Sequence, residues 1–487
     1  MELLAPAGGI EQLCAAIRFG ADAVYLATER FGMRARACNF PLENLPAAVG
    51  EAHAAGAKVH VTANILMSQE DIAALPAFFE AIDDAGVDAL IISDLGAFSL
   101  ARRYAPHVEL HVSTQASVAN AASARMWYEL GAKRVVCARE MSLEDIAAMR
   151  AETPRDLEIE VFAHGAMCMA VSGRCLISSY LTGRSANRGN CTQPCRWNYT
   201  LEEEKRPGIH FPVEEDGGTS FIMNAKDLNM LSHLDALREA GVDSIKIEGR
   251  NKKAFYVASV VGAYRRVLDG EDPALVEHEL YDLSHRPYGT GFFFGKPEQA
   301  VDYDGYEQEC VHVADVVGCE PLPDAVSCGN VSNFGTSCGN ASDPAVSCGN
   351  ASDPGIAACG AKGGAYRVLV RCRNRWEEGD ELEALIPRSP VVALTVRNLQ
   401  WHPETVDDQG GPVKLVESVP LARVGAQGET PGILLGADDG LSLGFGAPVP
   451  VAVANRSVAL YSFTCPRVIP PGSYLRMRKF RRSARHE

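Results

Sequence analysis

The chain has 487 residues, of which 47% are hydrophobic, so it can bury large cores and is expected to form two or three domains. The formal net charge of −16 argues against a generally basic nucleic-acid binder, because contacts to phosphates need Lys and Arg. No run of 18 apolar residues occurs and a strand-like Glu2-Leu3-Leu4 starts the chain, so the sequence predicts a cytoplasmic protein that neither enters a membrane nor is secreted.

Residues 1–283 alternate short apolar strands with amphipathic helices. A recurring junction, as in Gly20-Ala-Asp-Ala-Val, ends a helix at a left-handed Gly and starts a strand with a β-branched residue. Eight strands are predicted, at residues 3–5, 23–27, 58–63, 89–93, 110–113, 134–138, 158–163 and 244–248. Eight such units favour a closed (β/α)8 TIM-like barrel over an open doubly wound sheet.

In such a barrel, chemistry lies at the carboxyl ends of the strands. The polar residues expected there are Asn64, Asp94, Thr114, Gln115, Arg139, Glu140, His164, Asn224, Lys226, Glu248 and Arg250. A helix cap or a salt bridge is the more ordinary role for any single member. The whole set is hard to explain as core, because charged side chains are rarely buried unpaired.

A cysteine-rich insertion, residues 165–220, follows the seventh strand. Cys168, Cys175, Cys191 and Cys195 have the spacing C-x6-C-x15-C-x3-C, and four thiolates are the full ligand set of a tetrahedral zinc ion or a cubane cluster. Zinc usually takes two close cysteine pairs and only one is present, so the wide gaps favour a 4Fe-4S cluster, with zinc as the second choice. Alternatively, the four cysteines form disulfides or are buried thiols without a ligand. Disulfides are less expected because the cytoplasm is reducing.

Several stretches together carry a resemblance: EVFAHGAMCMAVSGRCLISSYLTGR with NCTQPCRW, MELLAPAGG at the start, and IKIEGRNKKAFYVASVVGAYR at residues 245–265. Over most of residues 1–318 the chain resembles the collagenase-like peptidase family, unassigned-peptidase family thirty-two. Within that family it looks like the branch of the prephenate-dependent tRNA uridine hydroxylases.

The resemblance implies an iron–sulfur-dependent tRNA uridine 5-hydroxylase, which converts a wobble uridine to 5-hydroxyuridine. Its partners would be tRNA and a prephenate-like co-substrate, a dicarboxylate that arginine pairs can hold. The candidate catalytic residues are His164, Glu140, Lys226 and Glu248, and the candidate substrate-binding residues are Arg139, Gln115 and Arg250.

Other functions stay open: a collagenase-like peptidase, a related iron–sulfur protein of rRNA or quinone hydroxylation, and an RNA-binding scaffold with a structural metal. The peptidase is disfavoured because the sequence has no H-E-x-x-H pair of zinc ligands. Nothing in the sequence indicates the oligomeric state.

The pattern changes after residue 283. Residues 284–310 read as a linker, and residues 311–400 as a small antiparallel β-barrel domain with strands at 311–317, 366–372, 381–386 and 391–399. Ser-Cys-Gly-Asn recurs every ten residues from Ser327, which predicts a flexible insertion at residues 319–362, with a second thiol or metal site as the less favoured reading. Residues 401–487 are expected to add further β structure and a basic tail that helps to hold RNA.

Overall fold

The computed structural model describes residues 1–33, 38–168, 175–197, 200–202, 210–212, 225–295, 297, 307–322, 365–403 and 448–479. The predicted Ser-Cys-Gly-Asn repeats with Cys328, Cys338 and Cys348, the rim residue Asn224 and the tail beyond Lys479 lie outside these residues.

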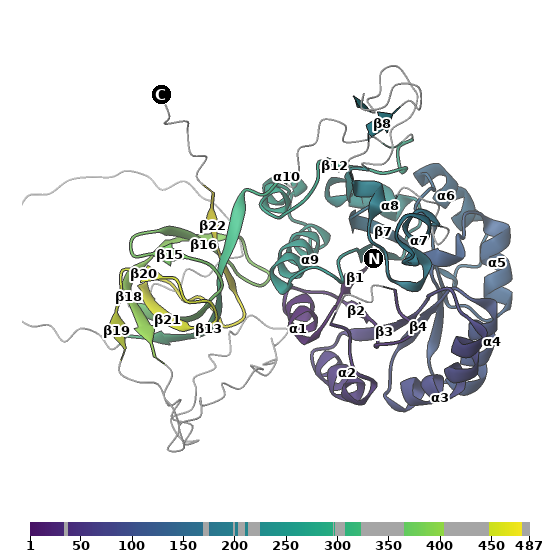
Figure 1. The fold of residues 1–487 in the computed structure, drawn as a ribbon, viewed down its shortest axis with the longest axis horizontal. Coiled ribbons are helices and arrows are strands. Elements are labelled where there is room, and N and C mark those ends of the chain that lie inside the picture. Colours follow the sequence, from purple (N-terminus) through teal and green to yellow (C-terminus); the bar gives the residue numbers. More distant parts are fainter. Residues whose placement is uncertain are drawn as a thin grey trace, which may run out of the picture.

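Eight parallel strands close into a barrel (Figure 1). They are β1 (Glu2–Pro6), β2 (Ala23–Leu26), β3 (Lys58–Ala63), β4 (Ala89–Ile92), β5 (Glu109–Val112), β6 (Arg134–Val136), β7 (Glu158–Gly165) and β11 (Ser244–Ile247). Strand β11 pairs in parallel with β1 on one side and with β7 on the other, and this double pairing closes the sheet. The predicted TIM-like barrel is therefore confirmed.

The outer ring consists of α1 (Ile10–Arg18), α2 (Leu45–Ala54), α3 (Gln69–Asp84), α4 (Leu95–Tyr104), α5 (Ala121–Glu129), α6 (Leu143–Ala151), α8 (Leu234–Glu239) and α9 (Ala254–Leu268). Apolar residues of alternate strand positions, such as Leu3 and Ala5, pack outward against these helices in one large core. Leu4, Ala23, Tyr25 and Ile91 form a separate small cluster inside the barrel. This alternation follows from the two-residue period of a strand.

The insertion after β7 contains α7 (Ile177–Thr182) and the short strands β8 (Thr200–Glu202) and β9 (His210–Pro212), which pair with each other. Strand β10 (Asp227–Asn229) then runs antiparallel to the end of β7 and pairs with β12 (Tyr288–Gly289). The first half of the predicted linker thus packs on the barrel, where His285 and Arg286 are buried. The short helices α10 (Pro273–Val276) and α11 (His278–Tyr281) lie between α9 and this linker.

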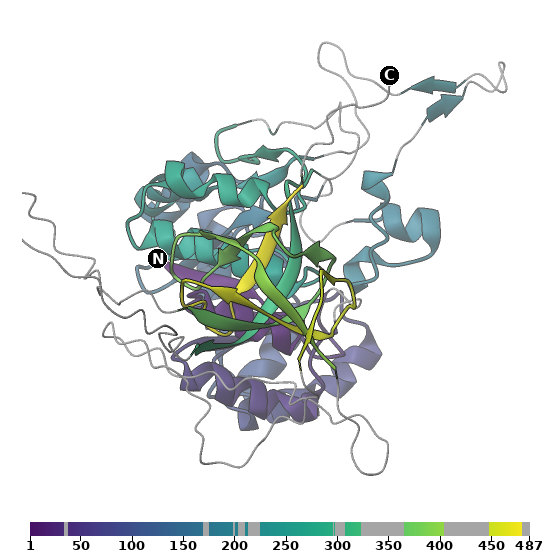
Figure 2. The ribbon, with the colours of Figure 1, turned by 90° about the vertical axis from the view of Figure 1, so that its left-hand side faces the viewer.

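The second domain is an antiparallel sheet that curls around its own core beside the barrel (Figure 2). Its strands lie in the order β17 (Val392–Thr395), β16 (Glu381–Leu385), β22 (Tyr474–Arg478), β13 (Cys310–Pro321), β14 (Tyr366–Cys372), β21 (Leu460–Cys465), β18 (Arg397–His402) and β19 (Val449–Pro450). A two-stranded pair, β15 (Trp376–Glu377) and β20 (Val453–Ala454), completes it. The run predicted as one strand at 391–399 is divided between β17 and β18, because β17 pairs with β16 and β18 with β21.

The first part of the predicted basic tail is strand β22, in the middle of this sheet. Its Arg476 is fully buried and its guanidinium lies 2.6 Å from Asp282 of the barrel domain and 2.9 Å from Glu383. Asp282 is fully buried and Glu383 is partly buried, and the two carboxylates compensate the charge of the buried guanidinium. This arginine therefore joins the two domains and is not available to RNA.

Candidate active site

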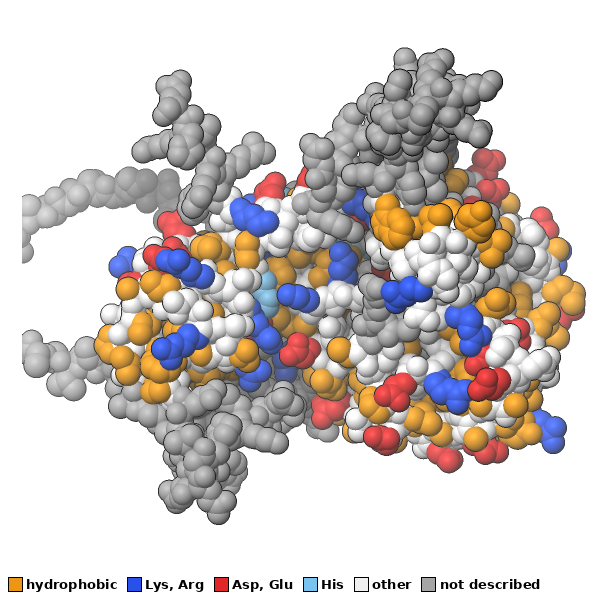
Figure 3. Space-filling view, in the orientation of Figure 1, with side chains coloured by type: hydrophobic (Ala, Val, Ile, Leu, Met, Phe, Trp, Pro, Cys, Tyr) orange, Lys and Arg blue, Asp and Glu red, His pale blue; other side chains and the backbone are white. Residues whose placement is uncertain are grey.

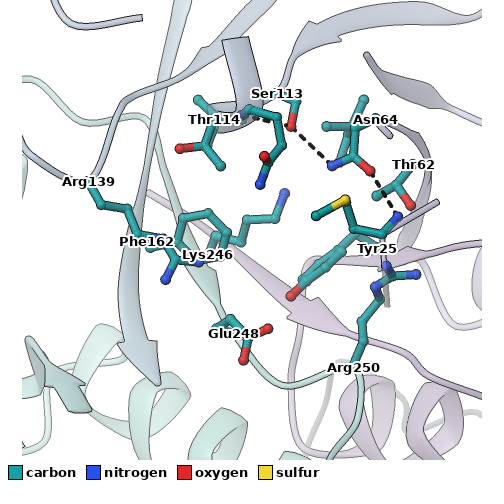
Figure 4. A pocket seen from close by; sticks show the side chains of 14 residues that line it. Tyr25, Thr62, Asn64, Ser113, Thr114, Arg139, Phe162, Lys246, Glu248 and Arg250 are labelled. Carbon is teal, nitrogen blue, oxygen red and sulfur yellow. Dashed lines mark hydrogen bonds between the residues drawn. The ribbon is translucent and has the colours of Figure 1, made fainter. Parts of the chain in front are cut away.

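A cavity opens at the carboxyl ends of the barrel strands (Figure 4). It is lined by Tyr25, Met33, Thr62, Asn64, Ile91, Ser113, Thr114, Gln115, Val136, Arg139, Phe162, Lys246, Glu248 and Arg250. Its volume of about 60 Å³ corresponds to roughly five water positions. The cavity can therefore take a carboxylate or the edge of a base, while the rest of a larger ligand would lie outside the rim.

One side of the cavity is a fixed row of hydrogen-bonding groups. The Asn64 side chain donates to Ser113 Oγ (3.1 Å) and accepts from the backbone N–H of Met33 (3.2 Å). Thr114 Oγ1 donates to the carbonyl of Cys137 (2.9 Å). These bonds fix the loops that follow β3 and β5, so the polar side of the cavity is preorganised.

The other side carries three cations and one carboxylate. Arg139 donates to the carbonyl of Ala166 (2.7 Å), and its guanidinium lies 3.8 Å from the centroid of the Phe162 ring. Lys246, from β11, places its ammonium 4.3 Å from the centroid of the Tyr25 ring. Arg250 is buried and Glu248 is half-buried. Excess positive charge in a narrow cavity favours an anionic ligand.

A buried ionic network forms the floor beneath Lys246. Lys246 Nζ lies 2.9 Å from Glu160, and Arg134 contacts the other oxygen of the same carboxylate at 2.9 Å. Burial by itself would raise the pKa of Glu160, but Lys246 and Arg134 hold it at about 2. Burial also lowers the pKa of Lys246, and Glu160 opposes that shift. The floor is thus a compensated set of charges that fixes the position of the lysine.

Four of the seven predicted catalytic and substrate-binding residues line the cavity, namely Gln115, Arg139, Glu248 and Arg250. Glu140 and Lys226 are half-buried outside it, and Lys226 lies against Gly289 of β12. Arg139 and Glu140 both lie in the turn that follows β6, and only Arg139 lines the cavity. Among the other rim residues, Asp94 caps α4 by accepting a hydrogen bond from Ala97 N–H (2.9 Å).

His164 lies behind the barrel wall and not in the cavity. Its ring is fully buried among Tyr256, Tyr264 and Tyr288, with centroids 6.2, 5.6 and 5.4 Å away. Burial is the largest cause that lowers its pKa to about 3, so the ring is neutral near pH 7. From this position His164 fills a packing space and does not reach a ligand in the cavity, which runs against its predicted catalytic role.

Tyr25 and Lys246 are cavity residues that the strand-end reasoning missed. The alternation of inward- and outward-facing side chains along their own strands could have predicted that they face the cavity. In Ser244-Ile-Lys-Ile the isoleucines pack outward on helices, which turns Lys246 into the barrel.

The cysteine segment is attached to the same rim. The backbone N–H of Leu66 donates to the carbonyl of Asn187 (2.8 Å), and Arg188 donates to the carbonyl of Leu66 (2.7 Å). Leu66 belongs to the loop after β3, whose first residue, Asn64, lines the cavity. The segment that carries the cysteines therefore borders the mouth of the barrel.

The cysteines themselves are reduced thiols at or near the surface. Cys168 is exposed and Cys175, Cys191 and Cys195 are partly exposed. Asn187 accepts from the backbone N–H of Cys175 (3.2 Å) and donates to its carbonyl (2.9 Å), and Gln193 N–H donates to Cys191 Sγ (3.3 Å). Within the described part of the chain, no three of the four sulfurs come within 4.8 Å of one another. A single zinc ion needs sulfurs about 3.8 Å apart, given a Zn–S bond of about 2.3 Å.

Comparison with known proteins places this architecture in a family. The sequence profile of Peptidase family U32 matches residues 8–302, which is more than half of the chain. The chain belongs to Peptidase family U32. The matched residues include the cysteine segment and every barrel strand except β1, and the match confirms the predicted family.

Relatives of this U32 chain carry different names. The tRNA hydroxylation protein P1 of Bacillus subtilis is 41% identical over 317 residues, which cover 63% of this chain and 72% of that protein. The 23S rRNA 5-hydroxycytidine C2501 synthase of Escherichia coli is 38% identical over 60% of this chain and 42% of that protein. A collagenase of Porphyromonas gingivalis is 35% identical over 61% of this chain and 74% of that protein.

In the described part of the U32 chain, the helices are too short or too polar to cross a bilayer.

Proposed function

We propose that this chain is an RNA-modifying enzyme that hydroxylates carbon 5 of a pyrimidine, and that its substrate is the wobble uridine of tRNA. One observation carries the proposal: a cationic cavity at the barrel mouth is bordered by a segment with four reduced cysteines. Relatives named for tRNA hydroxylation and for 5-hydroxycytidine synthesis in rRNA support the same chemistry.

Cys168, Cys175, Cys191 and Cys195 would hold a 4Fe-4S cluster as thiolates. Four irons each need one protein sulfur, so the ligands stand farther apart than around a single ion. The hydrogen bond from Gln193 N–H to Cys191 Sγ is of the kind that stabilises a thiolate ligand. Hydroxylation of a C–H bond is a two-electron oxidation that no side chain performs alone, and a bound cluster would supply electron transfer.

Arg139, Arg250, Gln115 and Lys246 would bind the anionic end of a prephenate-like co-substrate. The guanidinium of Arg139 is held by Ala166 and stacked on Phe162, so its orientation is set before a ligand arrives. The small volume fits one carboxylate in the cavity with the remainder at the rim, close to the cysteine segment. Glu248 supplies a carboxylate to the lining of this cavity and would accept the proton that leaves carbon 5.

The peptidase alternative has a relative named collagenase in its favour. Peptide hydrolysis needs an activated nucleophile or a metal-bound water. Among the described residues that line the cavity there is neither a histidine nor a cysteine, and Ser113 is hydrogen-bonded to Asn64 rather than to a base. The cavity therefore favours the hydroxylase.

The test is gain of function in a bacterial strain that lacks 5-hydroxyuridine derivatives in its tRNA. Expression of this chain should restore them, as measured by mass spectrometry of tRNA nucleosides. The purified protein should be brown under anaerobic conditions and absorb near about 400 nm. Absence of both the modified nucleoside and the colour would refute the proposal.

Two cysteine variants sharpen that test. Cys191→Ser should lose the absorbance and the modified nucleoside together, because one thiolate ligand is removed. Cys319→Ser, at a partly exposed cysteine of the β domain, is the matched control and should lose neither. The reverse pattern would show that the cysteine segment is not the cluster site.

A further inference from the structure

A large cleft lies between the barrel and the β domain. Its volume of about 710 Å³ is more than ten times the 60 Å³ of the cavity at the barrel mouth. The barrel contributes α1 from its start to its end and the start of α9, and the β domain contributes β13, β14 and the turn before β22. Figure 3 shows Lys and Arg side chains gathered in the hollow between the two domains.

The charge of the cleft opposes the charge of the chain. Five cations line it, namely Arg18, Lys252, Lys253, Arg371 and Arg373, against the two carboxylates of Glu11 and Asp315. Both carboxylates are engaged by Arg373, at 3.4 and 2.5 Å. A local excess of positive charge in a protein of net charge −16 attracts a polyanion to this cleft and not to the rest of the surface.

Two further features of the cleft suit phosphate groups. The first residues of helices α1 and α9 line the cleft and neither helix has a side-chain cap, so the positive end of each helix dipole lies near it. On the β domain, Nε of Arg371 is buried and has no hydrogen-bond partner among the described residues. The Arg371 side chain lines the cleft, and a guanidinium is a group that pairs readily with phosphate.

One loop connects residues that line the cavity with residues that line the cleft. Arg250 lines the cavity, and Lys252 and Lys253, two and three residues later, line the cleft. The loop is held in place because Gln12 donates to the carbonyl of Lys252 (3.1 Å) and Lys252 Nζ donates to that of Ser284 (3.3 Å). A chain of phosphates in the cleft would therefore pass beside the mouth of the barrel.

The two domains are fixed against each other along this cleft. Phe255 of α9 stacks on His312 of β13 with ring centroids 4.8 Å apart. The ring centroid of Tyr474 in β22 lies 6.0 Å from those of Phe255 and of Phe19, the residue that follows α1. The buried pair of Arg476 and Asp282 adds a second connection. The cleft is thus a preformed groove with one wall from each domain.

We infer that this cleft binds the phosphodiester backbone of the RNA substrate and so directs one base into the barrel mouth. That the polyanion is RNA rests on the proposed function. That it binds in this cleft rests on the charge and position of the cleft. It assigns RNA binding to Lys252, Lys253 and Arg371, while the reacting base and the co-substrate would meet at the mouth of the barrel.

The experiment measures binding of a fluorescently labelled, unmodified tRNA transcript to the full-length chain at several salt concentrations. The double variant Lys253→Ala/Arg371→Ala should bind about tenfold more weakly or worse, and the slope of log affinity against log salt should fall by roughly two, because about one counterion is released per phosphate contact. The control Arg102→Ala/Arg103→Ala removes two exposed cations from α4 and should change neither quantity. A further variant, Lys253→Arg/Arg371→Lys, keeps both charges and should keep the wild-type slope.

Equal affinity and slope for the wild type and the cleft variant would overturn the inference, provided that both unfold at the same temperature. The nucleoside assay keeps this result separate from the proposed function. If the chain modifies tRNA but binds it equally well without Lys253 and Arg371, the proposed hydroxylase function stands and RNA binding in the cleft is refuted. Weakened binding in the cleft variant, with modification restored at high tRNA concentration, supports both.

Discussion

Arg188 and Asp71 form the ion pair that ties the cysteine segment to the barrel, with Nη1 and Oδ2 2.8 Å apart. Burial alone would raise the pKa of Asp71, but hydrogen bonds from Arg188 and Ser68 hold it at about 2. Asp71 is also part of the capping box of α3, so the pair joins the segment to the first turn of a barrel helix.

Arg188→Ala should loosen this attachment, because it removes the donor to Asp71 and to the carbonyl of Leu66. Limited proteolysis should cut the segment several times faster, and the proposed cluster should bleach faster in air. Arg184→Ala removes an equal charge from an exposed position of the same segment and serves as the control. Identical rates for both variants would contradict a role of the Arg188 contact in docking.

Arg139→Lys should weaken binding of a dicarboxylate co-substrate while leaving the fold intact. Lysine keeps the charge but loses the planar fork and the stack on Phe162, so we expect an affinity about 10- to 100-fold lower. Calorimetric titration with prephenate measures it. Arg125→Lys, at an exposed arginine paired with Glu152, is the matched control, and an unchanged affinity in Arg139→Lys would show that the anion binds elsewhere.

The barrel could be predicted because its information is local. Each strand is a short apolar run and several follow a Gly junction. All eight predicted strands are present within a few residues of the predicted ends. The pairing of β22 with β13 and β16 could not be predicted in this way, because it joins residues more than 80 positions apart along the chain. The basic character of residues 474–478 suggested a solvated tail, whereas Arg476 is neutralised by two distant carboxylates.

Site residues could be predicted where their position at the end of a strand is enough to bring them to the cavity. Arg139 and Glu248 follow their strands directly and line the cavity as expected. His164 also ends a strand, but whether it faces the interior or the helices depends on the bulge that shifts the register between β7 and β11 at Ile247. The sequence carries no signal for such a bulge, so it could not show that His164 faces the helices and not the cavity.

His164→Phe should flatten the dependence of stability on pH. The folded-state pKa of about 3 lies below the usual value of 6.5, so between these values the unfolded chain binds the proton first, and stability falls as pH decreases through this window. Removing the imidazole should reduce that slope by up to about 1.4 kcal/mol per pH unit, measured by denaturant unfolding between pH 4.5 and 6 in apoprotein. At pH 7.5 the phenyl ring should fit among the tyrosines with little change. Parallel pH profiles for wild type and variant would contradict the buried, neutral state of His164.

Gly165→Ala should disrupt the junction between the cysteine segment and the cavity. Gly165 has φ +102°, and an added Cβ would lie 2.8 Å from the carbonyl oxygen of Glu248 and 3.0 Å from its Cβ. Gly183→Ala is the matched control, since Gly183 also has a positive φ of 68° but nothing lies within 4 Å of an added Cβ. Backbone strain alone should cost the control about 1–2 kcal/mol of unfolding free energy, whereas Gly165→Ala should cost more and should also displace Glu248. Thermal unfolding measures the first effect and the rate of tRNA modification the second. Equal losses of stability in the two variants, with modification unaffected, would show that the contact between Gly165 and Glu248 does not position the carboxylate.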